Sequence, residues 1–211
     1  MGRLKLYGEP GWGSAIVEAQ LAWYGLEYDF EQVGDLFKSA DSRRRLTSVN
    51  PLAQVPTLVL ADGTVMTESA AITLFLADIA NDDALVPRTG DPLRPTFLRW
   101  LIFLVANVYP TYTYADDPSR FVEATDAQQK FKDAVDRYAR RLYSLLEEQA
   151  QEPWFFAGRF SALDVYVTVM TRWRPGRAWF AEHAPRLLAI ATKTETLDRL
   201  AAVWLKNFPS V

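Results

Sequence analysis

Hydrophobic and polar positions in the first part of the chain follow two different periods. Residues 4–7 and 28–33 show the weak alternation of strands, and the apolar side chains of 14–24 recur at helical spacing. Residues 35–48 are polar and basic, which predicts a short surface helix, whereas an apolar stripe in 72–79 predicts a helix packed on a sheet. The chain therefore begins strand, helix, strand, and a helix follows at the end of this part.

Two prolines frame a polar elbow in the segment 50–58, Asn-Pro-Leu-Ala-Gln-Val-Pro-Thr-Leu. Pro56 has no N–H and fixes its own φ, so Gln54 and Val55 should be extended and a buried strand should begin at Thr57. If the bond before Pro56 is cis, Val55 would turn its N–H and C=O outward, where an extended peptide could pair with them.

A hairpin follows the elbow. The Asp62-Gly63 pair is a strong turn signal, and it predicts that residues 57–60 and 64–66 form antiparallel strands. Ser69 then stands where it can cap a helix. The order strand-helix-strand, short helix, strand-strand-helix is that of a thioredoxin-like domain, which we expect to span residues 1–80.

The elbow and the helix after the hairpin carry complementary polar groups. Free N–H groups and the positive dipole end of a helix beginning at Ser69 suit a carboxylate, and Glu68 suits an amine. A small peptide with both an α-carboxylate and an α-amine would match these groups. Each feature also has a purely structural explanation, because most X–Pro bonds are trans and Ser69 is an ordinary capping residue.

The second part of the chain is helical in pattern. Three prolines and a glycine in residues 81–95 indicate a linker, and helical periodicity dominates residues 96–211, which we expect to form an all-α domain. Ser161 and Asp164 have the spacing of a capping box that begins a buried central helix. This box is a folding signal and carries no chemistry.

Composition narrows the possible chemistry. The chain has 211 residues, a formal net charge of −3, a pI near 5.3 and no cysteine, so disulfides, thiolate metal sites and a cysteine nucleophile are excluded. With His183 as the single histidine, no metal site is predicted, and a broad nucleic-acid surface is not expected. No apolar stretch has the length of a signal peptide or a membrane span, which favours a cytoplasmic protein.

Several motifs, in this order along the chain, resemble those of cytosolic glutathione transferases. They are Leu6-Tyr7 with the loop to Ser14, the elbow, Thr67-Glu68-Ser69 and the segment 158–164. The bacterial beta-type branch is the most similar. The resemblance implies a thioredoxin-like domain followed by an all-α domain, with glutathione as co-substrate and no metal. By similarity, glutathione would be bound by Gln54, Val55, a cis Pro56, Glu68 and Ser69, with Lys38 or one of Arg43, Arg44 and Arg45 at its glycine carboxylate.

The sequence departs from the beta-type branch where the thiol would be activated. That branch has a cysteine at the position of Gly13 and a histidine at that of Tyr109. A free thiol with a pKa of about 8.5 needs a donor to ionise at neutral pH. Ser14, which we expect to cap the first helix, and Tyr7 are the candidate catalytic hydroxyls, and backbone N–H groups are the alternative. Glu9 would disfavour a thiolate if it pointed at the sulfur.

The second substrate is expected to be a small, hydrophobic electrophile in an aromatic pocket between the domains. The candidate residues are Trp12, Tyr109, Tyr112, Arg172 and Trp173. The stretch 109–114 departs from helical spacing, which favours an exposed functional surface. The resemblance also implies a homodimer. The alternatives are a non-catalytic binding or regulatory module of the same fold and a narrower glutathione-dependent isomerase, dehalogenase or peroxidase.

Overall fold

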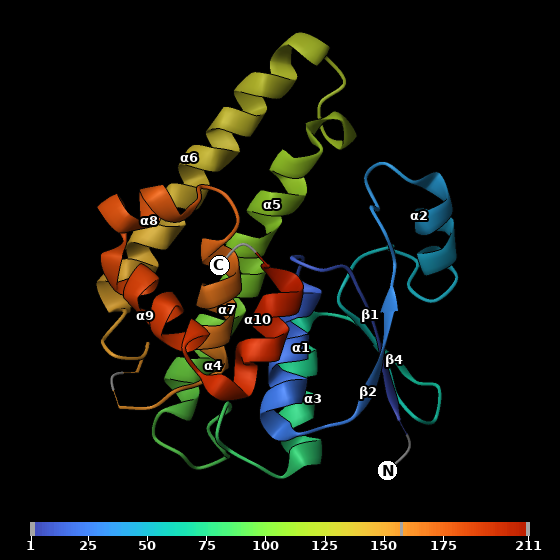
Figure 1. Ribbon diagram of the computed structural model, residues 1–211. Helices are drawn as coiled ribbons and strands as arrows, with labels where there is room; N and C mark the ends of the chain where they lie inside the picture. The colour runs from blue at the N-terminus through green and yellow to red at the C-terminus, as the bar shows by residue number, and fades with distance from the viewer. Residues whose placement is uncertain (1–2, 157, 210–211) are drawn as a thin grey trace. The chain divides into compact units, whose positions relative to one another are not determined.

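A computed structural model describes residues 3–156 and 158–209. In its first part, strands and helices alternate in the predicted order (Figure 1). The elements of this part are β1 Leu4–Gly8, α1 Ser14–Tyr24, β2 Tyr28–Gln32, α2 Ala40–Thr47, β3 Thr57–Val59, β4 Val65–Met66 and α3 Ser69–Ala80. The helices that follow are α4 Arg94–Phe103, a π-helical turn Leu104–Val108, α5 Tyr109–Asp116, α6 Thr125–Gln149, α7 Ala162–Thr171, α8 Arg177–His183, α9 Pro185–Glu195 and α10 Ala201–Asn207.

The four strands form one mixed sheet in the order β2-β1-β3-β4. Strand β1 pairs in parallel with β2, where Leu6 lies opposite Phe30, and antiparallel with β3, where Leu6 lies opposite Leu58. The hairpin between β3 and β4 turns at Asp62-Gly63 as predicted, and Leu60 N–H donates to Thr64 O. The thioredoxin-like prediction is confirmed by this topology.

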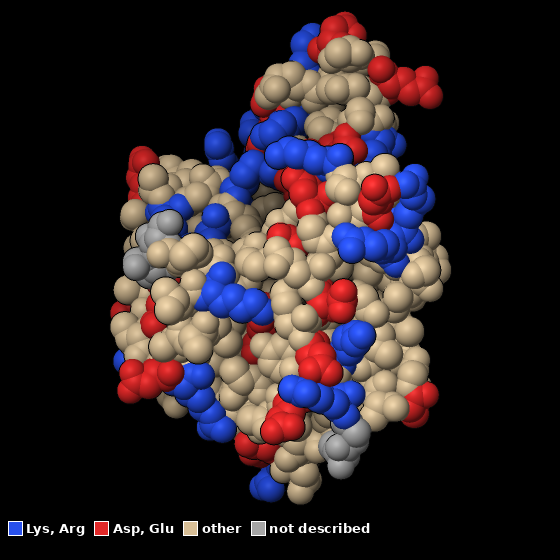
Figure 2. All heavy atoms as spheres, turned by 45° about the vertical axis from the view of Figure 1, so that its right-hand side comes forward, with Lys and Arg blue, Asp and Glu red and all other residues tan. Residues whose placement is uncertain are grey.

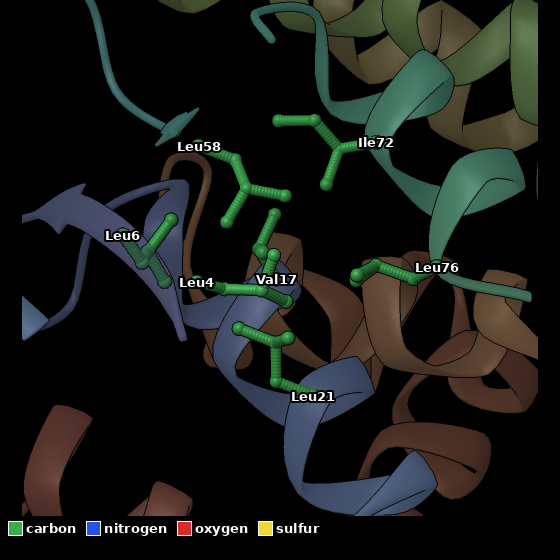
Figure 3. Close-up of a cluster of buried hydrophobic side chains, with 7 residues drawn as sticks. All are labelled: Leu4, Leu6, Val17, Leu21, Leu58, Ile72 and Leu76. Carbon is green, nitrogen blue, oxygen red and sulfur yellow. The ribbon is translucent and has the colours of Figure 1, made fainter. Parts of the chain in front are cut away.

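Alternation along β1 divides its side chains between two apolar clusters. Leu4 and Leu6 join Val17, Leu21, Leu58, Ile72 and Leu76 in the main cluster, which Figure 3 shows between the sheet and two helices. Those helices, α1 and α3, lie side by side on one face of the sheet, and α2 lies on the other side (Figure 1). Tyr7 points the opposite way from Leu6 and packs on a smaller cluster of Val33, Leu36 and Leu46.

The chain divides into two compact units, and the last segment belongs to the first of them. One unit contains the residues up to Val86 together with those from Thr194 onward, and the other is Pro87–Lys193. The boundary at residues 86–87 falls inside the expected linker 81–95. The expected domain 96–211 differs from the second unit because α10 contacts α1, where buried Glu18 accepts hydrogen bonds from Lys206 and Asn207.

The central helix of the second unit, α7, is buried over its whole length. The expected capping box is present: Asp164 accepts from Ser161 N–H at 2.7 Å, and its other oxygen accepts from Phe155 N–H at 2.7 Å. Burial raises the pKa of Asp164 to about 6, against the opposing effect of these hydrogen bonds. The box therefore fixes both the start of α7 and the end of the preceding loop.

Three local expectations need correction. Gly13 and Glu68, rather than Ser14 and Ser69, are the capping residues of α1 and α3, and neither makes a side-chain capping bond. The hydroxyl of Ser14 is instead used by the preceding loop. The stretch 109–114 stays helical, because the π-helical turn just before it absorbs the change of spacing ahead of Pro110.

Charged side chains of both signs are interspersed on the face drawn in Figure 2. None of the helices in the described residues is long and apolar enough to cross a membrane.

Candidate functional site

Buried polar side chains hold the proline elbow in shape. Asn50, 3% exposed, donates from Nδ2 to Gln54 O at 3.0 Å and to Thr57 Oγ1 at 3.0 Å, and Thr57 Oγ1 donates to Gln54 O at 2.8 Å. The Val55–Pro56 peptide bond is cis, and Pro56 is buried. Within the described residues, the main chain of Val55 has no hydrogen-bond partner. The main chain of Val55, with a free N–H and C=O, is thus held against a rigid support.

The N-terminus of α3 is tied to α1 by a second buried network. Thr73 Oγ1 donates to Ser69 O at 2.9 Å and accepts from Gln20 Nε2 at 3.0 Å. Ser69 is buried, whereas Glu68 before it is exposed and has φ 62° and ψ 102°. A non-glycine residue at such a φ is strained, and strain of this kind collects where function requires it.

Ser14 fastens the loop between β1 and α1. Its hydroxyl donates to Glu9 O at 3.0 Å and accepts from Glu9 N–H at 3.1 Å, and Ser14 is fully buried. Gly8 leaves the necessary room, because a Cβ there would lie 2.5 Å from Ser14 Cβ. The hydroxyl proposed for thiol activation is therefore committed to the backbone of Glu9.

The beginning of α1 offers backbone donors in place of that hydroxyl. The N–H groups of Gly13 and Ser14 have no partner among the described residues, as is usual in the first turn of a helix. The Glu9 carboxylate is held at residues 32–34, where it accepts from Gly34 N–H at 2.8 Å and from Gln32 Nε2 at 3.0 Å.

The remaining candidates of the first unit have different surroundings. Tyr7 packs its ring on the cluster of Val33, Leu36 and Leu46. Lys38 is largely exposed and lies 3.5 Å from Asp35, and Arg43 donates to Leu36 O at 2.8 Å, so Arg43 supports the loop.

Trp12 lies beside an aromatic residue that the sequence pattern did not single out. Its ring and that of Phe37, which is 48% exposed, have centroids 5.2 Å apart. Phe37 falls in a polar stretch without periodicity, so no sequence signal pointed to it.

The candidates of the second unit form an aromatic cluster. Trp173 meets Tyr109 and Tyr112 edge to face, with centroids 5.6 and 4.9 Å apart. Tyr112 donates to Arg174 O at 2.9 Å and shares a short hydrogen bond with Tyr143. The buried hydroxyl of Tyr109 has no hydrogen-bond partner in the described residues, and burial raises its pKa well above the ordinary value. Arg172 caps the end of α7 next to Trp173.

No group of three or more His, Cys, Asp or Glu side chains in the described part of the chain could hold a metal ion.

Known proteins are similar to this chain in sequence and in fold. A sequence model described as the glutathione S-transferase N-terminal domain matches residues 14–79. An Escherichia coli K12 protein named uncharacterized GST-like protein YncG is 41% identical over 205 residues, which are 97% of this chain and 98% of the relative. The chain belongs to the glutathione S-transferase family.

Solved structures of the family agree with this assignment. A glutathione transferase homolog from Sulfitobacter shares the fold, with a TM-score of 0.86 at 23% identity over 96% of this chain and 97% of that chain. A beta-class enzyme from Sphingomonas chungbukensis and a sphingomonad enzyme complexed with glutathione are each 27% identical over 94% of this chain and 96% of theirs. Their TM-scores are 0.72 and 0.73. The resemblance to the beta-type branch is thus confirmed at the level of the family, although this chain has no cysteine.

Proposed function

We propose that the protein binds glutathione against its proline elbow and adds the thiol to a small electrophile. The observation that carries the proposal is the unpaired main chain of Val55, held in place by the buried Asn50–Thr57 pair. The cysteinyl residue of glutathione would pair with Val55 as an added strand. The γ-glutamyl end would take its carboxylate to Ser69 at the start of α3 and its amine to Glu68.

Backbone N–H groups supply the activation of the thiol in this proposal. The donors are those of Gly13 and Ser14, whose orientation is fixed by the Ser14 hydroxyl on Glu9. Donors aimed at a developing anion favour the thiolate without moving a proton to a side chain. Ser14 thus contributes through its N–H and by fastening the loop, and Tyr7 contributes packing.

Two measurements on the purified protein test this function. Calorimetric titration should show one glutathione per chain, and chlorodinitrobenzene should be conjugated with consumption of glutathione. Binding without turnover of any electrophile would favour the alternative of a non-catalytic module. If saturating glutathione produces no heat and no protection of the Val55 amide, the proposal is wrong.

We expect Tyr109→Phe to stabilise the protein and to weaken its use of an electrophile. Removing a buried hydroxyl without a partner relieves a cost of about 1 kcal/mol or more. If this hydroxyl contacts the second substrate, KM for the electrophile should rise while KM for glutathione stays constant. Tyr114→Phe is a matched control, since Tyr114 is 41% exposed on the same helix. A KM for the electrophile equal to that of the wild type would remove Tyr109 from the substrate site.

The surface of the second unit supports the inference of a homodimer. An apolar groove of about 350 Å³ is lined by Ala106, Asn107, Pro110, Thr111, Tyr114, Phe131, Ala134, Val135 and Tyr138. The first unit exposes Leu52 to 65%, and a two-fold dimer in which each first unit meets the partner's second unit would cover both surfaces.

The dimer has a simple test. Sedimentation should give twice the chain mass, and Tyr138→Lys, which places a charge in the groove, should shift the equilibrium to monomer. A wild-type protein that sediments as a monomer at micromolar concentration would contradict the inference.

A further inference from the structure

The last helix of the chain carries a buried polar cluster that reaches the loop before α1. Glu18 of α1 is fully buried, and its carboxylate accepts from Tyr28 OH at 3.1 Å, Lys206 Nζ at 2.5 Å and Asn207 Nδ2 at 3.1 Å. Lys206 and Asn207 are the last two residues of α10, which lies beside α1 (Figure 1). Burial of a carboxylate without partners is costly, so Glu18 and its two donors hold the end of α10 against α1.

The contacts of Asn207 determine which way its amide points. Nδ2 donates both to Glu18 and to Val203 O, at 3.1 and 3.0 Å, so this atom is the nitrogen, because two acceptors face it. Oδ1 then accepts from Gly11 N–H at 3.0 Å. The backbones of Gly11 and Asn207 lie close together, since a Cβ on Gly11 would be 3.3 Å from Asn207 O. Gly11 also has φ 79°, a conformation that residues with a side chain rarely adopt.

We propose that Asn207 is a positioning residue for thiol activation. It holds the loop of residues 9–13 at Gly11, while Ser14 holds the same loop at Glu9. The two attachments lie at the start and inside the turn of residues 9–12, which leads into Gly13 and Ser14. The N–H groups of Gly13 and Ser14 face the thiolate in the proposed function. The inference rests on that function. It assigns to the C-terminal helix the task of keeping these donors aimed at the sulfur.

In the proposed function, the residues that bind glutathione differ from those that stabilise its thiolate, so the role of Asn207 can be measured separately. Glutathione is held mainly by Val55, Glu68 and Ser69, which Asn207 does not contact. Releasing Gly11 should therefore leave the affinity for glutathione nearly unchanged and reduce the stabilisation of its thiolate. The expected result is a lower kcat, a higher pKa of the bound thiol and a constant KM for glutathione.

The test compares Asn207→Ala with Lys206→Met. Both variants remove a donor from the same buried carboxylate, but only Asn207 reaches the loop. Lys206→Met also removes the positive charge paired with Glu18, so it is a stringent control for lost stability. For Asn207→Ala we expect kcat to fall about fivefold to tenfold, as for the loss of one hydrogen bond. The ultraviolet absorbance of bound thiolate should titrate at higher pH. Lys206→Met should keep the wild-type kcat and thiol pKa.

Hydrogen exchange of the Gly11 amide gives a readout that needs no glutathione. The amide should exchange faster in Asn207→Ala than in the wild type or Lys206→Met. If the two variants lose kcat in proportion to their loss of stability, or if Asn207→Ala keeps the wild-type kcat and thiol pKa, Asn207 has only a structural role. The inference then fails, and the proposed function still stands. If the wild-type protein neither binds nor consumes glutathione, the proposed function fails and this inference fails with it.

Discussion

Replacing Glu68 with alanine is expected to weaken glutathione binding by about 10-fold to 100-fold, the equivalent of one charge-assisted hydrogen bond. Glu68 is exposed, and among the described residues its carboxylate accepts one hydrogen bond, from Thr67 Oγ1 at 3.5 Å, while its backbone oxygen accepts from Ile72 N–H. The fold does not depend on its carboxylate, so calorimetry should show the loss of affinity while the circular dichroism spectrum is preserved. In the proposed function, this exposed carboxylate binds the amine of the ligand, and the strained φ of Glu68 holds it at the start of α3.

Glycine at the same position separates strain from binding. Glu68→Gly removes the carboxylate and also relieves the cost of φ 62°, so it should raise the free energy of unfolding by about 1 kcal/mol. It should weaken glutathione binding as much as Glu68→Ala does. Glu27→Ala is the matched control, because Glu27 is an exposed glutamate of the same unit. If Glu68→Ala and Glu27→Ala bind glutathione equally well, the amine contact is elsewhere.

The elements that sequence predicted well are those specified by neighbouring residues. The Asp62-Gly63 turn and the box of Ser161 and Asp164 each depend on residues within a few positions of one another. The elbow belongs to the same group, because Pro56 and Asn50 act over a single short segment. Local structure of this kind can be predicted from sequence because its geometry follows from the spacing of a few residues.

The features that sequence could not supply depend on contacts between distant residues. Asn207 lies 196 positions from Gly11, and Glu18 lies 188 positions from Lys206, so no periodicity connects them. The return of α10 to the first unit was missed for this reason. Ser14 shows the same limit at short range. A serine at this position could cap the helix, donate a hydrogen bond to a thiolate or hold the loop, and only the direction of its hydroxyl decides among these roles.

Replacing Asp164 with alanine is expected to lower the free energy of unfolding by about 3–4 kcal/mol, since two buried N–H groups lose their acceptor at about 1–3 kcal/mol each. These groups belong to Phe155 and Ser161, and the Ser161 hydroxyl, which donates to Asp164 Oδ2 at 3.0 Å, loses its acceptor as well. Because α7 is buried throughout, an incorrectly started helix disturbs the core of the second unit. Chemical denaturation at neutral pH measures the effect.

A second acidic residue separates the buried network from the helix dipole. Asp126 lies in the first turn of α6 and is exposed, so Asp126→Ala removes a charge near a helix N-terminus without breaking a buried hydrogen bond. It should cost less than about 1 kcal/mol. The ratio of the two effects is the informative quantity. If Asp164→Ala cost no more than Asp126→Ala, the carboxylate would be acting through its charge alone, and the hydrogen bonds to Phe155 and Ser161 would not be what secures the start of α7.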